Sequence, residues 1–116
     1  MSKRHSTRAL LSTSKASASL FAALGDETRI RLVYRLCDEG PLSIARLTEG
    51  SDVTRQAVTK HLRVMEDAGL VRCDWRGRET VWQLNRQRLD DAQRYIDLIS
   101  KQWDGALDRL RKLVED

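Results

Sequence analysis

The sequence predicts a mostly α-helical domain with one small β-hairpin, and three observations predict this class. Apolar residues recur at helical spacing through most of the chain, the period changes to alternation over residues 70–84, and one cluster of turn residues, Arg76-Gly77-Arg78, divides that alternating segment. The chain has 116 residues, which suits one domain with a tail.

The N-terminal tail, residues 1–17, is expected to be a basic arm without fixed structure. It is rich in Ser and Thr, poor in large apolar side chains and free of acidic residues. Its four bases equal the formal net charge of +4, so the rest of the chain is balanced. The folded domain is expected over residues 18–114.

Three helices are expected before residue 50, and the second and third begin at capping residues. Residues 20–24 form the first, which ends near Gly25; Asp26 then caps a second helix that Gly40-Pro41 ends, and Ser43 caps a short third helix. The buried stripe of the second helix is expected to comprise Ile30, Leu32, Val33, Leu36 and Cys37.

The fourth helix, residues 54–68, is expected to have an apolar and a polar face, with Thr54 as its cap and Gly69 after its end. The apolar face comprises Ala57, Val58, Leu62, Val64, Met65 and Ala68. The opposite face carries Gln56, Thr59, Lys60, Arg63 and Asp67, with Arg55 and Glu66 beside it. His61 falls among the apolar residues, so we expect a packed, hydrogen-bonded histidine rather than a phosphate contact or a metal ligand.

A hairpin and a long helix complete the chain. Strands are expected over residues 70–75 and 80–84, with Trp75 and Trp82 packing across the pair, and a helix over about residues 88–114.

The helix carries an apolar stripe spaced 4, 3, 4, 3, 4, 3, formed by Ala92, Ile96, Ile99, Trp103, Ala106, Leu110 and Leu113. A small domain cannot cover the whole stripe, so we expect a two-fold dimer whose seam also includes Leu20, Phe21 and Leu24. The alternatives are packing against its own domain or a frayed end.

This order of elements describes a winged helix-turn-helix, in which the second helix of the turn motif enters the DNA major groove and the hairpin wing contacts the backbone or adjacent minor groove. Residues 54–88 also carry more bases than acids. Arg, Gln and Thr are the side chains that read base edges. The candidate DNA contacts are Thr54, Arg55, Gln56, Thr59, Lys60 and Arg63 on the helix and Arg76 and Arg78 on the wing. The alternative is a polar helix face that meets only water.

The segments 42–47, 53–62 and 68–71, together with 21–29 and the wing tip 76–78, resemble the ArsR/SmtB family of bacterial repressors. The resemblance covers roughly residues 18–114, although Gln56 stands where many members have proline. It implies a homodimeric repressor that binds a double-stranded DNA operator and is released by an effector. It also implies that Thr54, Arg55, Gln56, Thr59 and Lys60 face the DNA.

The metal sites known in this family are not matched. Ser43 and Ala45 occupy the positions that would supply thiolates, and no histidine follows His61 to join the acids of the last helix. We therefore expect a metal-independent member with no metal and no cofactor. Cys37 and Cys73 are expected to be small apolar residues rather than a redox switch.

The sequence thus predicts a cytoplasmic, sequence-specific transcriptional regulator, a homodimeric repressor with autoregulation left open. The alternatives are a repressor that responds to a metal, an oxidant or a small ligand at an unrecognised site, and a winged-helix module for protein–protein contacts. An enzyme is not expected, because no Ser-His-Asp arrangement and no glycine-rich phosphate loop is present. The longest uncharged apolar stretch, residues 20–24, is too short to span a membrane.

Overall fold

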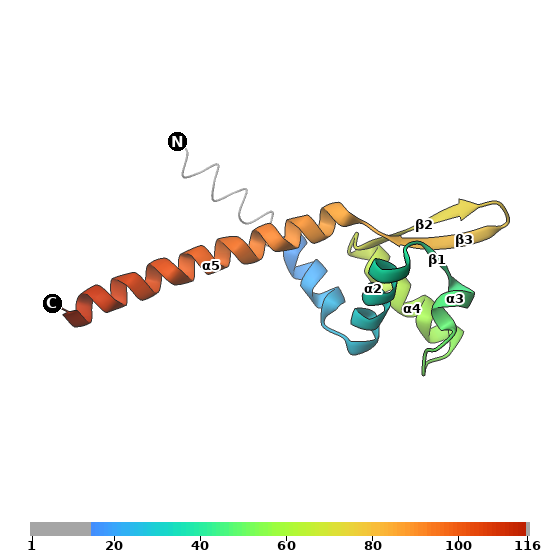
Figure 1. Cartoon of the computed structure of the whole chain (residues 1–116), viewed down its shortest axis with the longest axis horizontal. Coiled ribbons are helices and arrows are strands. Elements are labelled where there is room, and N and C mark those ends of the chain that lie inside the picture. Colours follow the sequence, from blue (N-terminus) through green and yellow to red (C-terminus); the bar gives the residue numbers. More distant parts are fainter. Residues whose placement is uncertain (1–14, 116) are drawn as a thin grey trace.

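The computed structural model describes residues 15–115, and it confirms a mostly helical fold with a small antiparallel sheet (Figure 1). Residues 15–24 form the first described helix, which packs beneath the last one. The other elements are α2 (Glu27–Glu39), β1 (Leu42–Ser43), α3 (Ile44–Thr48), α4 (Arg55–Asp67), β2 (Val71–Arg76), β3 (Glu79–Leu84) and α5 (Arg86–Glu115). In the described part of the chain, no helix is both long and apolar enough to cross a membrane.

The folded domain begins earlier than predicted, at residue 15 instead of residue 18. Residues 15–17 were assigned to the arm, but they are helical, and Ser17 is only 1% exposed. The reason is an anchor from α5, because Nη2 of Arg88 donates to the carbonyl oxygen of Ala16 at 3.0 Å. Residues 1–14, which hold the rest of the predicted arm, lie outside the described residues.

Helix α2 begins where its cap predicts, but its buried stripe is narrower. The Asp26 carboxylate accepts a hydrogen bond from the backbone N–H of Arg29 at 3.0 Å, which satisfies a donor of the first turn. Leu32 and Leu36 are buried and Val33 is half-buried. The predicted core positions Ile30 and Cys37 are instead exposed, because the rest of the domain covers only one narrow side of this helix.

The sheet has three strands in the order β1-β3-β2, one more than the predicted hairpin. The extra strand β1 has two residues and pairs Leu42 with Trp82 and Ser43 with Val81. Such a strand is too short to show alternation in the sequence. The turn of the hairpin is also tighter than predicted, because Arg76 pairs with Glu79 and leaves only Gly77 and Arg78 in the loop. Gly77 has a φ of 64°, as the first loop residue of a type II′ turn requires.

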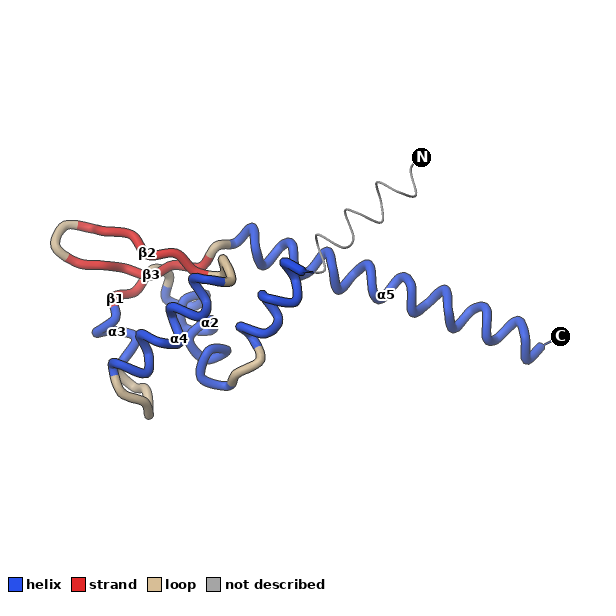
Figure 2. Tube along the Cα trace, turned by 180° about the vertical axis from the view of Figure 1, so that it is seen from behind, coloured by secondary structure: helices blue, strands red, loops and turns tan. Residues whose placement is uncertain are grey.

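The two hairpin tryptophans differ, contrary to the prediction that both pack across the strands. Trp82 is 5% exposed and belongs to the core. Trp75 is 74% exposed, because it lies beside the turn, where β2 and β3 extend past the helices (Figure 2). It pairs with Thr80, a small residue that cannot cover an indole ring.

The core unites residues from nearly every element. Its largest fully buried apolar side chains are Leu20, Leu47, Val58, Leu62, Met65 and Leu70. Full burial of one such side chain stabilises the fold by about 1.5–3 kcal/mol. Because two of the six come from the helix 15–24 and from α3, these short helices are held by the same core that holds α4.

The junction between α4 and α5 is fixed by Arg88 and Asn85. The Arg88 guanidinium donates to the carbonyl oxygen of Ala68 at the end of α4, and Asn85 Nδ2 donates to that of Gly69 at 3.1 Å. Gly69 has a φ of 75°, and a side chain there would lie 3.1 Å from Nε of Arg88. From this junction α5 crosses the N-terminal end of the helix 15–24 and then projects beyond the other elements (Figure 1).

Candidate nucleic-acid interface

Helix α4 is held by its apolar face. Thr54 caps it, since the Thr54 hydroxyl oxygen accepts from the backbone N–H of Ala57 at 3.1 Å. Val58, Leu62 and Met65 are each 0% exposed, so one side of the helix is fixed in the core. The predicted apolar residue Val64 is instead 43% exposed, because it lies beyond the edge of this buried stripe.

The opposite face of α4 presents cations, an amide and a hydroxyl to solvent. Arg55, Gln56, Lys60 and Arg63 are exposed, and only Arg63 has an ion-pair partner in the described chain, Glu66 at 3.8 Å. The Thr59 hydroxyl donates to the carbonyl oxygen of Arg55 at 2.9 Å. Its proton is therefore used within the helix, and its methyl group and oxygen lone pair remain for a partner. Such a set can contact both base edges and phosphates.

His61 packs and forms hydrogen-bonded contacts, as its place among the apolar residues predicted. Nη1 of Arg29 donates to Nδ1 of His61 at 3.2 Å, and Oδ2 of Asp26 lies 3.8 Å from the same nitrogen. Arg29 also donates to the carbonyl oxygens of Ala22 and Ala23, at the end of the first described helix. This cluster ties α4 to α2 and to the helix 15–24, so it supports the position of the exposed face.

The same cluster affects the ionisation of Asp26. The backbone N–H of Arg29 stabilises the carboxylate and, with the nearby guanidinium charge of Arg29, holds the pKa of Asp26 below its ordinary value of 3.8 against a smaller opposing effect of burial. The cap of α2 is therefore charged at neutral pH.

Helix α3 completes the turn motif and is tied to α2. Ser43 caps it, with the Ser43 hydroxyl oxygen 3.3 Å from the backbone nitrogen of Arg46. At its other end Nη1 of Arg35 donates to the carbonyl oxygens of Leu47 at 3.1 Å and Glu49 at 2.9 Å. These bonds satisfy carbonyls that a helix end leaves unpaired. They fix α3 against α2 and so set where the following loop starts.

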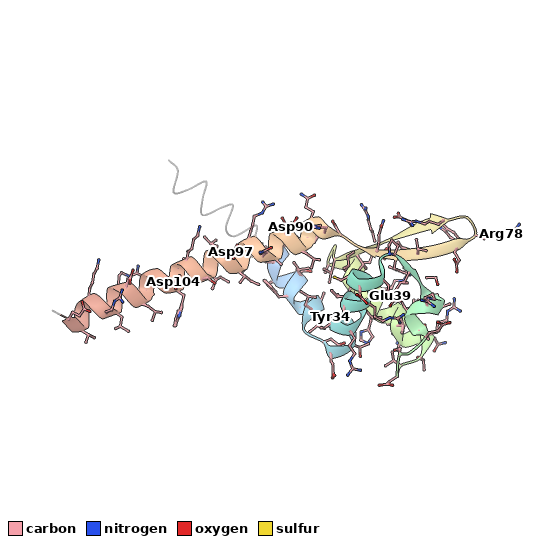
Figure 3. All side chains as sticks on the ribbon, in the orientation of Figure 1. Tyr34, Glu39, Arg78, Asp90, Asp97 and Asp104 are labelled. Atoms are coloured by element: carbon pink, nitrogen blue, oxygen red, sulfur yellow. The ribbon has the colours of Figure 1, made fainter. Side chains whose placement is uncertain are left out.

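The wing presents two arginines at its tip. Arg76 and Arg78 are exposed, and Figure 3 shows Arg78 at the far end of the hairpin. Neither has an ion-pair partner among residues 15–115. The exposed Trp75 next to Arg76 was missed as a candidate contact residue. The alternation places Trp75 on the face of the sheet that carries Trp82. Trp75 is exposed because the hairpin is long enough to extend beyond the helices, which the alternation does not show.

The residues predicted for the dimer seam fall into three groups by exposure. Leu20 and Ala92 are buried inside their own chain, at 0% and 7% exposure, so neither side chain is open to a second copy. Phe21 and Leu24 are half-buried, and the Phe21 ring lies 6.1 Å from that of Tyr95. The outer part of the stripe is open, with Ala106 half-buried and Ile96, Ile99, Trp103, Leu110 and Leu113 between 49% and 76% exposed.

The acids of α5 lie apart from this stripe. Asp90, Asp97 and Asp104 are spaced seven residues apart and follow one line along the helix (Figure 3). Within residues 15–115, no three His, Cys, Asp or Glu side chains gather closely enough to hold a metal ion. Burial and the nearby Glu66 carboxylate raise the pKa of the Cys73 thiol, which disfavours the reactive thiolate.

Comparisons with known proteins agree with this geometry. A family model described as a helix-turn-helix domain matches residues 24–74. The HTH-type transcriptional regulator Rv2034 of Mycobacterium tuberculosis is 34% identical over 106 residues, which cover 90% of this chain and 94% of that protein. The structure of an ArsR-like transcriptional regulator from Rhodococcus sp. RHA1 is similar, with a TM-score of 0.80 and 32% identity over 88% of this chain and 95% of that one.

A third comparison concerns the fold alone. The homodimeric winged helix-turn-helix DNA-binding domain of Mb0332 from Mycobacterium bovis, described as a possible ArsR-family regulator, has a TM-score of 0.59 at 18% identity and covers 89% of each chain. The likeness thus extends well beyond the turn motif and includes the wing and much of α5.

Proposed function

The chain belongs to the ArsR family of winged helix-turn-helix transcriptional regulators, and we propose that it is a homodimeric repressor. In this proposal α4 reads the operator and the wing contacts the neighbouring DNA backbone. The family is one of DNA-binding regulators and not of enzymes. The proposal includes a double-stranded DNA operator, a cytoplasmic location and an effector of small size that releases the DNA.

The observation that carries the proposal is the two-sided character of α4. Three of its apolar side chains are fully buried, while its N-terminal half exposes Arg55, Gln56 and Lys60 without partners in the described chain. A rigid helix with unpaired polar groups suits a major groove, because these groups lose little on leaving water for base edges and phosphates.

We assign base reading to Arg55, Gln56 and Thr59, and phosphate contacts to Lys60, Arg63 and the start of the helix. Arg55 and Gln56 suit guanine and adenine edges, and Thr59 suits a thymine methyl group. Lys60 and Arg63 suit phosphates, as do the free backbone N–H groups after Thr54. Arg76 and Arg78 on the wing suit the backbone or a narrow minor groove. Trp75 lies beside them and can pack on a deoxyribose.

The exposed stripe on α5 supports the dimer. The helix has 30 residues, so it is about 45 Å long at 1.5 Å per residue. Its apolar side chains beyond Tyr95 stay open to solvent in the monomer, which is costly unless another surface covers them. A two-fold seam covers both copies at once, and the homodimeric state of the Mycobacterium bovis domain gives a precedent in the same fold.

A mobility-shift titration against the protein's own upstream DNA tests the proposal. At about 150 mM salt we expect binding at least about 10³-fold tighter than to a random duplex of the same length. Arg55→Ala or Gln56→Ala should weaken the specific complex by about 1–3 kcal/mol and relax the preference at one base position in each half-site. Arg111→Ala, an exposed arginine near the far end of α5, is the matched control and should change neither quantity. Equal binding to operator and random DNA would refute the proposal.

A further inference from the structure

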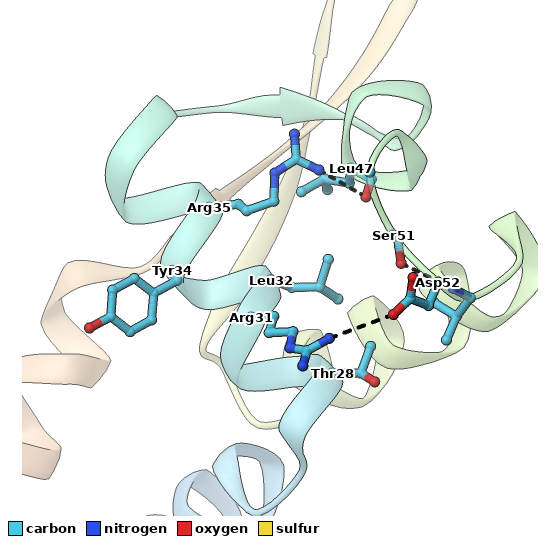
Figure 4. Close-up of a pocket in the computed structure, with 10 residues that line it drawn as sticks. Thr28, Arg31, Leu32, Tyr34, Arg35, Leu47, Ser51 and Asp52 are labelled. Carbon is cyan, nitrogen blue, oxygen red and sulfur yellow. Dashed lines mark hydrogen bonds and ion pairs between the residues drawn. The ribbon is translucent and has the colours of Figure 1, made fainter.

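A cavity of about 330 Å³ lies between α2 and the loop that leads into α4 (Figure 4). Its lining comes from one side of α2, from Leu47 at the end of α3 and from residues 50–53 of the loop. The volume is at the lower end of the range for small-molecule sites. Neither the DNA-facing surface of α4 nor the apolar stripe of α5 lines it.

The cavity combines an apolar floor with a charged mouth. Leu32 and Leu47, at 3% and 0% exposure, close the bottom of the cavity without offering surface to a ligand, and the accessible apolar lining includes the half-buried Val53. At the mouth the Arg31 side chain is 66% and the Asp52 side chain 94% exposed. Figure 4 shows the Arg31 guanidinium and the Asp52 carboxylate facing each other across this opening.

The ion pair at the mouth is weak. Nη1 of Arg31 lies 3.9 Å from Oδ2 of Asp52, whereas Nη2 of the same guanidinium lies 2.7 Å from Oε1 of Glu27. An exposed pair at the longer distance gains little in water. The Nη1 group of Arg31 is therefore available to a carboxylate that lies closer to it than Asp52 does.

We propose that this cavity binds a small amphipathic carboxylate, with the carboxylate on Arg31 in place of Asp52 and the apolar body against Val53. The guanidinium matches a carboxylate in charge and in planar geometry. The apolar floor excludes water from the body of the ligand, which gives the affinity that a charge alone cannot supply. A fully polar anion such as phosphate would leave this floor uncovered.

Occupancy should act on DNA binding through the loop, and this step rests on the proposed function. Asp52 lies two residues before Thr54, the cap of α4. The Arg31–Asp52 pair joins the loop to α2, while Arg35 separately fixes the end of α3. A ligand seated between Arg31 and Asp52 pushes the loop away from α2 at the start of α4, where Arg55 and Gln56 follow. We therefore expect the occupied protein to bind its operator more weakly.

The experiment uses 1-naphthoate as the probe and the neutral 1-naphthalenemethanol as its matched control, with binding to the full chain followed by calorimetry in the absence of DNA. We expect naphthoate to bind at least about tenfold more tightly than the alcohol. Arg31→Gln should abolish this difference, and Asp52→Asn should tighten naphthoate binding severalfold because it removes the competing carboxylate. Arg111→Gln is the control variant, since that arginine is 69% exposed and also pairs with an acid on its own helix. It should bind like the wild type.

A second arm measures operator affinity with and without saturating naphthoate. We expect a loss of at least about tenfold in the wild type and no loss in Arg31→Gln. Equal binding of acid and alcohol, or unchanged binding by Arg31→Gln, would overturn the site. Tight naphthoate binding with unchanged operator affinity would overturn the coupling. Failure to bind operator without any ligand would instead count against the proposed function, and the calorimetric arm would still decide the site.

Discussion

Replacing Trp103 by alanine tests the seam on α5 most sharply. Trp103 is 64% exposed in the single chain and lies in the middle of the open part of the stripe. A tryptophan offers about 200 Å² of surface, so about 130 Å² of Trp103 is available to a partner. Complete burial of this area at about 25 cal/mol per Å² would give about 3 kcal/mol per copy. If a two-fold seam covers half of each indole, the dimer loses about 3 kcal/mol, or roughly a 10²-fold rise in its dissociation constant.

Sedimentation equilibrium over a wide concentration range measures this change. The matched control is Trp75→Ala, because Trp75 has the same side chain at 74% exposure but lies on the wing. It should leave the dimerisation constant unchanged. The reasoning would be refuted if Trp103→Ala dimerised like the wild type, or if both variants lost the dimer equally.

Three further predictions concern the core, the cap of α2 and the wing. Leu62→Ala should lower the free energy of unfolding by about 2–5 kcal/mol in urea denaturation because Leu62 is fully buried, whereas Val64→Ala on the exposed edge should cost under about 1 kcal/mol. The lowered pKa of Asp26 stabilises the fold above the ordinary value of 3.8, and this contribution is lost as the pH falls through the lower folded-state pKa. Urea melts of Asp26→Asn should therefore show a smaller decrease in stability over that acidic range, and equal slopes for both proteins would contradict the assignment. Arg76→Ala should weaken all DNA sequences alike and reduce the slope of log affinity against log salt by about 1, and an unchanged slope would remove Arg76 from the phosphate contacts.

The sequence predicted the starts of α2, α3 and α4, because each begins at a side chain whose chemistry is local. The first described helix instead begins at residue 15 and not at the predicted residue 20. Asp26, Ser43 and Thr54 cap the three helices for which they were predicted. The buried positions Val58, Leu62 and Met65 of α4 followed from its period, as did the packed state of His61, whereas the predicted core residue Val64 is exposed.

The features that the sequence did not predict depend on contacts between elements that lie far apart in the chain. Strand β1 has two residues, so only its partner β3 identifies it. Ile30 and Cys37 satisfy the apolar period of α2 but lie where no neighbouring element covers them. Trp75 was misassigned for the same reason, because alternation gives the face of a strand and not how far the core extends along it. The cavity beside Arg31 is formed by residues from three elements, and no local pattern signals it.

In the proposed complex, two copies of this chain are joined through α5 and place two α4 helices on one face of one duplex. Hydroxyl-radical footprinting on the upstream DNA, with the mass of the complex measured in parallel, tests it most directly. We predict two protomers per duplex and two protected half-sites with centres about 10–10.5 base pairs apart, or a multiple of this spacing. One protomer per duplex, or protection without a symmetric pair of half-sites, would contradict it.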